Sequence, residues 1–122
     1  MLLVDTSVWS DHLRRHDDVM AQLLDASQVL AHPFVTGEIA CGLFPRRTET
    51  LALLSRLPSA PLLGQAELLA FIERHALAGK GVGFVDVHLL ASALVAGAGV
   101  WTRDRRLAKA ATELGIAAYS GR

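Results

Sequence analysis

Four acidic residues of this 122-residue chain stand inside or directly after apolar stretches, where a carboxylate is costly to bury. They are Asp5, Glu38, Asp86 and Asp104. An isolated buried carboxylate is strongly disfavoured, so it normally takes up a proton, pairs with a cation or binds a metal. One such acid would be ordinary, but four in a short chain favour a fold that gathers them around a divalent cation.

The elements that would position these acids alternate between short apolar runs and longer helical patterns. The apolar runs predict strands at 2–4, 28–31, 60–63, 100–102 and 116–119. Helical spacing of apolar residues, with caps and breakers, predicts helices at 6–15, 19–26, 33–43, 48–57, 65–77, 85–96 and 104–114. Strands separated by helices imply parallel pairing, so we expect an α/β fold, a three-layer α/β/α sandwich around a short central parallel sheet.

In such a sheet, ligands bind beyond the carboxyl ends of the strands. Asp5 and Asp104 are expected there, because each follows a short strand and precedes a helix. Asp86 begins a helix that is apolar nearly all round, where the helix dipole partly stabilises a negative charge. Small neighbours around Glu38 would let its helix pack closely and let the carboxylate point into a cleft.

Oxygen-only ligation suits Mg²⁺ or Mn²⁺ rather than Zn²⁺. Mg²⁺ uses one or two direct carboxylates together with waters and phosphate oxygens. Four acids would therefore serve one tightly held ion plus either a second ion or an activated water. This donor set predicts hydrolysis of a phosphodiester.

Each acid also has a structural interpretation. Asp5 and Asp104 could be plain helix N-caps, although Thr6 or Ser7 is the expected cap of the first helix. Asp86 could be a buried cap or a member of an ion pair, and Glu38 could lie on a solvated helix face. The co-occurrence of all four acids favours the metal site over these separate explanations.

Composition narrows the class of protein. The 12 basic and 12 acidic residues give zero net charge, so overall charge does not indicate a nucleic-acid-binding protein. Cys41 is the only cysteine, which excludes an intramolecular disulfide. Asp5 interrupts the N-terminal apolar run, and no apolar stretch approaches the roughly 18 residues of a membrane span. We expect one domain over 1–122, soluble, cytoplasmic and without membrane contact.

Four segments taken together resemble the PIN domain, and within it the VapC toxins of bacterial toxin–antitoxin systems. The segments are Val-Asp-Thr-Ser-Val-Trp at 4–9, Thr-Gly-Glu-Ile at 36–39, Val-Asp-Val-His-Leu-Leu-Ala at 85–91 and Trp-Thr-Arg-Asp at 101–104. Each is weak alone, but their order and spacing agree and the resemblance covers the whole chain.

The resemblance implies a Mg²⁺- or Mn²⁺-dependent endoribonuclease, a hydrolase that cleaves RNA. Asp5, Glu38, Asp86 and Asp104 match the catalytic, metal-binding quartet, and Thr6, Ser7 and Thr102 match polar positions that support it. Such toxins are usually homodimers and are silenced by a cognate antitoxin. The dense negative charge and the surplus of apolar residues suggest that the antitoxin covers an apolar groove and inserts a basic side chain among the acids.

Three arginines are candidates for contact with RNA phosphates: Arg103, Arg105 and Arg106. A solvated helix face is the alternative for Arg106. Trp9 and Trp101 lie in apolar runs and are expected in the core rather than as base-stacking platforms. His88 falls where many relatives carry a small or apolar residue, and the sequence assigns it no role.

Two other functions remain open. A receiver-like phosphoacceptor module fits the length and the α/β alternation. It needs an acidic pair after the first strand, however, and Asp5 is followed by Thr6, while no suitable lysine follows a later strand. A PIN fold that binds partners without cutting is the other alternative, which the intact quartet disfavours.

Overall fold

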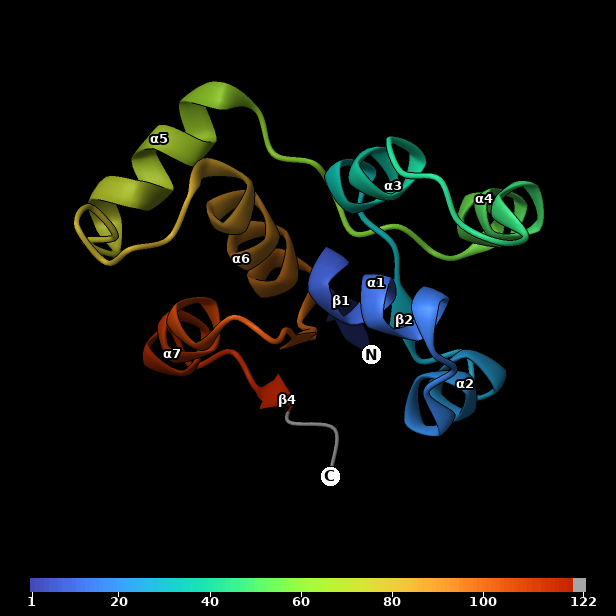
Figure 1. Ribbon diagram of the computed structural model, residues 1–122. Coiled ribbons are helices and arrows are strands. Elements are labelled where there is room, and N and C mark those ends of the chain that lie inside the picture. The colour runs from blue at the N-terminus through green and yellow to red at the C-terminus, as the bar shows by residue number, and fades with distance from the viewer. Residues whose placement is uncertain (120–122) are drawn as a thin grey trace.

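The computed structural model describes residues 1–119, and its centre is a four-stranded parallel sheet. The strands are β1 (Leu2–Val4), β2 (Val29–Leu30), β3 (Gly99–Trp101) and β4 (Ala118–Tyr119), in the order β2-β1-β3-β4. β1 and β3 are neighbours in the middle, and their register pairs Val4 with Trp101. The predicted α/β architecture with a short parallel sheet is confirmed (Figure 1).

Helices connect the strands and surround the sheet (Figure 1). They are α1 (Thr6–Arg14), α2 (Asp18–Asp25), α3 (Pro33–Ala40), α4 (Arg47–Arg56), α5 (Gln65–Arg74), α6 (Phe84–Ala96) and α7 (Arg105–Glu113). Within residues 1–119, none of them has both the length and the apolar character needed to cross a membrane.

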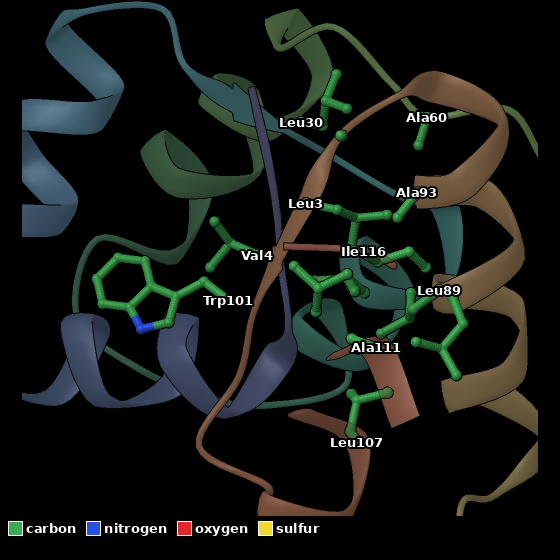
Figure 2. Close-up of a cluster of buried hydrophobic side chains, with 14 of the residues drawn as sticks. Leu3, Val4, Leu30, Ala60, Leu89, Ala93, Trp101, Leu107, Ala111 and Ile116 are labelled. Carbon is green, nitrogen blue, oxygen red and sulfur yellow. The ribbon is translucent and has the colours of Figure 1, made fainter. Parts of the chain in front are cut away.

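The core lies on both faces of the sheet. Figure 2 shows Leu3 beside Leu89 and Ala93 of α6, whereas Val4 lies with Trp101 on the other side of β1. All of these side chains are at most 1% exposed. The alternation of Leu3 and Val4 follows from the two-residue period of a strand. Trp9 is also 1% exposed, so the prediction that both tryptophans belong to the core is confirmed.

The predicted strand at 60–63 is wrong. Only an isolated parallel bridge forms there, between Ala31 and Ser59, with the Ala60 N–H donating to the Ala31 carbonyl at 2.8 Å. Pro58 and Pro61 flank the bridge and have no N–H to donate, so the pairing cannot extend into a ladder.

Two helices end three residues earlier than predicted, at Ala40 rather than 43 and at Arg74 rather than 77. The α3 end is held by Arg47, whose guanidinium donates to the carbonyls of Ala40 and Gly42. Such donors satisfy carbonyls that have no partner within the helix. After α5, Ala76 takes the left-handed conformation at φ 51°, which the helix cannot continue through.

Helix α6 is buried in its middle rather than all round. Residues 87–93 are buried, but Phe84, Leu94 and Val95 are 47%, 42% and 64% exposed. The helix ends at Gly97, which adopts φ 65° as the C-cap. Glycine takes this left-handed conformation without steric cost, which gives α6 a defined stop before β3.

Candidate active site at the carboxyl ends of β1 and β3

Asp5 follows β1 directly and is 9% exposed. Its backbone N–H donates to the Trp101 carbonyl at 2.9 Å, which fixes the end of β1 beside the end of β3. Its Oδ1 accepts from the Thr6 N–H at 2.8 Å, so Asp5 itself is the N-cap of α1. The prediction that Thr6 or Ser7 caps this helix is therefore wrong, because the acid before them takes the N-cap position and accepts from the first N–H of the helix.

A hydroxyl network ties the two strand ends together. Asp5 Oδ2 accepts from Thr102 Oγ1 at 2.7 Å and from Ser7 Oγ at 2.9 Å. Ser7 Oγ in turn accepts from the Arg103 N–H at 3.0 Å, and Thr102 Oγ1 accepts from the Asp104 N–H at 3.0 Å. Two of the three hydroxyls predicted to support the site, those of Ser7 and Thr102, therefore orient Asp5, and Thr102 leads directly to Asp104.

Glu38 comes from the middle of α3 and is exposed. Its Oε1 accepts from Thr6 Oγ1 at 2.8 Å, which links it to the residue next to Asp5. It also lines a surface pocket of about 440 Å³ between α1 and the end of α3, together with Leu13, Ile39 and Phe44. The expectation that this carboxylate points into a cleft agrees with its place in the pocket wall.

Asp86 lies in the first turn of α6 and is half-buried. Its Oδ2 accepts from the Gly83 N–H at 3.2 Å and so closes the first turn of the helix. Burial raises the pKa of this carboxyl above its ordinary value, the Gly83 hydrogen bond opposes that rise, and the charges of Asp5, Asp104 and Glu38 add to it. All three other predicted acids therefore act on Asp86 electrostatically.

Asp104 is exposed and is the N-cap of α7. Its Oδ1 accepts from the N–H groups of Arg106 at 2.8 Å and Leu107 at 3.3 Å. Each of the three aspartates therefore has a local capping role as well as a place in the acidic cluster, so the two interpretations of the sequence do not compete.

Among residues 1–119, no group of three or more His, Cys, Asp or Glu side chains lies in an arrangement that could hold a metal ion. The hydrogen bonds explain these positions, since Asp5, Asp86 and Asp104 are each turned toward backbone N–H groups. Four like charges also repel one another without a counter-ion. The fold thus brings the other three acids within electrostatic reach of Asp86 without placing the four in direct ligand geometry.

The three candidate arginines differ in their surroundings. Arg103 is paired with Asp11 at 3.1 Å and Asp17 at 3.4 Å, and its guanidinium lies 5.3 Å from the centre of the Trp101 ring. Those intramolecular contacts hold the Arg103 guanidinium at the surface, where its side chain is 40% exposed. Arg105 and Arg106 are exposed on the first turn of α7, next to Asp104.

Two phenylalanines, on the helices that carry Glu38 and Asp86, pack against a buried histidine, a cluster that the sequence did not single out. The His88 ring lies 4.5 Å from Phe34 and 4.8 Å from Phe84, centre to centre. One feature of the sequence could have indicated this cluster: Phe34 precedes Glu38 by one helical turn, and Phe84 precedes Asp86 by two residues. The offset alone does not tell which side of each helix the rings occupy.

Comparison with known proteins gives a consistent result. Residues 2–113 match the PIN domain family. The chain is 45% identical over 118 residues to Ribonuclease VapC32 of Mycobacterium tuberculosis, which covers 96% of this chain and 95% of the relative.

Solved structures share the fold at lower identity. FitAcB from Neisseria gonorrhoeae superposes with a TM-score of 0.64 at 20% identity, covering 99% of this chain and 98% of that one. FitAB bound to an IR36 DNA fragment gives a TM-score of 0.68 at 21% identity, with coverage of 99% and 95%. From the family match and the 45% identity over nearly the full length, this chain belongs to the PIN-domain family and, within it, to the VapC group.

Proposed function

We propose that this protein is an endoribonuclease that hydrolyses RNA phosphodiester bonds as the toxin of a toxin–antitoxin pair. The observation that carries the proposal is the hydrogen-bond network at the carboxyl ends of β1 and β3. It holds Asp5 through Ser7 and Thr102, leads from Thr102 to the Asp104 backbone, and links Glu38 to Thr6. The 45% identity to a protein named as a ribonuclease supports RNA as the substrate. The receiver-like alternative has no support in the family match.

The donor chemistry fits a hard divalent cation, Mg²⁺ or Mn²⁺. The candidate ligands are oxygen atoms only, from four carboxylates with hydroxyls beside them. The pKa of Asp86 is raised in part by its acidic neighbours, a repulsion that a cation would relieve. Mg²⁺ keeps several waters, so the acids need not all contact it. When bound, the cation supplies Lewis-acid polarisation of the phosphate and activation of water.

The side chains of the chain take separate parts in this proposal. Asp5 and Asp86 hold the cation, and Thr6, Ser7 and Thr102 keep Asp5 and Glu38 in orientation through their hydrogen bonds. Glu38 and Asp104, both exposed, would hold metal or orient the attacking water. Arg105 and Arg106 contact RNA phosphates beside Asp104. Arg103 is the weakest of the three candidates for this role, because Asp11 and Asp17 already bind it.

Removal of divalent metal tests the proposal. Purified protein incubated with a mixed RNA pool should cut in Mg²⁺ or Mn²⁺, and EDTA should reduce the rate by at least about 10³-fold. Addition of excess Mg²⁺ should restore it. The same preparation with a DNA pool measures substrate preference. Cutting that persists unchanged in EDTA would contradict the metal-dependent reaction.

A cognate antitoxin is the second proposed partner, and the pocket beside Glu38 is where we propose that it binds. Apolar side chains of Leu13, Ile39 and Phe44 line the pocket, and Leu43 at its rim is 96% exposed. A basic antitoxin side chain placed there would reach the acids. Saturating antitoxin should abolish RNA cleavage, and Leu43→Asp should weaken the inhibition at least tenfold without changing cleavage by the free toxin. Equal inhibition of the parent and the Leu43→Asp variant would show that the antitoxin binds at another surface.

We also propose that the protein is a homodimer, an expectation that rests on the family resemblance alone. Sedimentation equilibrium of the purified chain measures this directly, and a mass of one chain at all concentrations would exclude it.

A further inference from the structure

Three aromatic rings form a cluster where α3 meets the start of α6. The aromatic cluster consists of Phe34, Phe84 and His88. Both phenyl rings meet the imidazole nearly at right angles, at interplanar angles of 74° and 82°. His88 is 5% exposed and His32 behind it is fully buried, with Nε2 of His32 3.1 Å from Ser92 Oγ. The cluster therefore has a rigid, buried back.

Its front is open. Phe84 is 47% exposed, although it begins α6, which carries more buried residues than any other helix of the described chain. Single exposed apolar residues are common and need no explanation by themselves. Phe84 differs from a freely rotating surface residue because its ring packs on a fixed, buried histidine. It presents a planar apolar face in a defined position.

The two phenylalanines come from the two helices that also carry two of the acids. Phe84 follows Gly83, whose N–H holds the Asp86 carboxylate. Phe34 lies one turn before Glu38 on α3, and residues four apart share a helix face. The cluster is therefore carried by the same two helices as Glu38 and Asp86, within about one helical turn of each acid along the chain.

Positive charge lies near the start of α6. The loop before α6 lies close to α7, because the side chain of Arg106 packs directly on Gly81. A Cβ atom added at Gly81 would lie only 2.7 Å from the Cδ atom of Arg106. Gly81 has φ 78°, so a side chain at this position would be strained and would collide with the arginine. Glycine thus lets the arginine side chain lie directly against the loop that leads into Phe84.

We propose that Phe84 is a stacking platform for an unpaired RNA base next to the scissile phosphate, with Phe34 and His88 as residues that position its ring. This inference rests on the proposed ribonuclease function and adds a substrate requirement to it. Proteins bind single-stranded nucleic acid without strong sequence preference by combining basic side chains for the backbone with aromatic faces on which bases stack. Arg106 and Phe84 offer one of each on the two sides of the loop before α6. A base within an A-form duplex is stacked on both faces and cannot use the platform. The site therefore selects unpaired nucleotides.

Binding can be measured with RNA kept intact by the Asp86→Asn substitution. On that background we compare Phe84→Leu, Phe84→Tyr and Phe84→Trp, using labelled mixed-sequence 12-nucleotide RNA, single-stranded or annealed to its complement. Val95→Ala is the matched control, because Val95 is exposed on the same helix about 16 Å farther along it. Thermal melting checks that each variant is folded.

Phe84→Leu should weaken single-strand binding roughly tenfold and leave duplex binding unchanged, since one base–aromatic stack is lost. Phe84→Tyr and Phe84→Trp should retain the affinity, and Val95→Ala should match the parent. RNA should also quench the fluorescence of the new tryptophan, against a constant background from Trp9 and Trp101, each 1% exposed. In cleavage by single variants with Asp86 present, Phe84→Leu should raise KM about tenfold with little change in kcat.

Three outcomes would overturn the platform: unchanged single-strand affinity in a folded Phe84→Leu protein, an equal loss for single strand and duplex, or no quenching in Phe84→Trp. If Phe84→Leu instead releases the antitoxin and binds RNA normally, the surface is a protein contact. A parent chain that neither cuts nor binds RNA refutes the ribonuclease proposal and the platform with it. If the parent cuts RNA and the Phe84→Leu variant cuts and binds it equally well, only the platform is refuted.

Discussion

Asp86→Asn is expected to reduce RNA cleavage by at least about 10³-fold, equivalent to about 4 kcal/mol of lost transition-state stabilisation. Asparagine removes the negative charge that the proposed cation needs. It keeps a side-chain oxygen that can accept from the Gly83 N–H, so the first turn of α6 should remain capped. Loss of activity in this variant would then report on chemistry rather than on folding.

The same variant should be at least as stable as the parent in metal-free buffer. The pKa of Asp86 is raised in the folded state, chiefly by burial, so its ionised form opposes folding at neutral pH. A neutral side chain removes that penalty and the repulsion from the other acids. Urea unfolding at pH 7 in EDTA measures the difference, and a large loss of stability would show that Asp86 is held by an attraction that we have not identified.

Asp5→Asn should also abolish cleavage, but at a cost in stability. Asp5 accepts from Thr102 Oγ1 and Ser7 Oγ on the same oxygen and from the Thr6 N–H on the other, and an amide offers only one acceptor. Asp18→Asn is the matched control, since its side chain is 88% exposed and contacts only His16 among the ion pairs of the described residues. Full cleavage by both the Asp5 and the Asp86 variants would refute the proposed site.

Stability should fall as the pH drops from about 6.5 toward 4, because His32 is buried in its neutral form. Its Nδ1 accepts from the Phe34 N–H at 3.1 Å, and Nε2 lies 3.1 Å from Ser92 Oγ. Burial, and to a smaller extent the nearby His88, lowers the pKa of His32 to about 4. The unfolded chain then binds a proton that the folded chain excludes between those pH values, so stability rises with pH in this window.

The neutral burial of His32 lowers the free energy of unfolding by roughly 3 kcal/mol near pH 4, and it has no such effect above the pKa of histidine in the unfolded chain. Urea unfolding at several pH values measures the slope. His32→Asn keeps an acceptor for the Phe34 N–H and removes the titrating ring, so the variant should be less stable at pH 7 but have a flatter pH profile. His16→Asn, at a side chain 67% exposed, should leave the profile as it is. A His32→Asn protein with the parental slope would assign the pH dependence to other groups.

The placement of the acids at the ends of strands and helices was predictable, because it depends on local rules. Short apolar runs followed by Asp5 or Asp104 indicate strands that end in helix caps, and parallel strands place such ends on one edge. The helix that begins near Asp86 was recognisable from its apolar length and from Gly97. These features involve neighbours in sequence, so no knowledge of distant contacts is required.

Features that depend on a partner far along the chain were not predictable. The segment at 60–63 has the composition of a strand but lacks the N–H groups to extend its pairing with Ala31. The pairing of Arg103 with Asp11 and Asp17 joins residues more than 80 positions apart. His88 had no assigned role until its ring was seen against Phe34, which comes from a different helix early in the chain.

The sequence by itself determined that Asp5, Glu38, Asp86 and Asp104 are carried by an α/β fold with a parallel sheet, because periodicity and capping are local properties of the chain. Only the tertiary structure decided how these acids are held. The pairing of β1 with β3 brings Thr102 to Asp5, and the packing of α3 against α6 brings Phe34 onto the buried ring of His88. Those contacts arise between segments that meet only once the core has formed, since burial of apolar side chains, and not sequence proximity, brings them together.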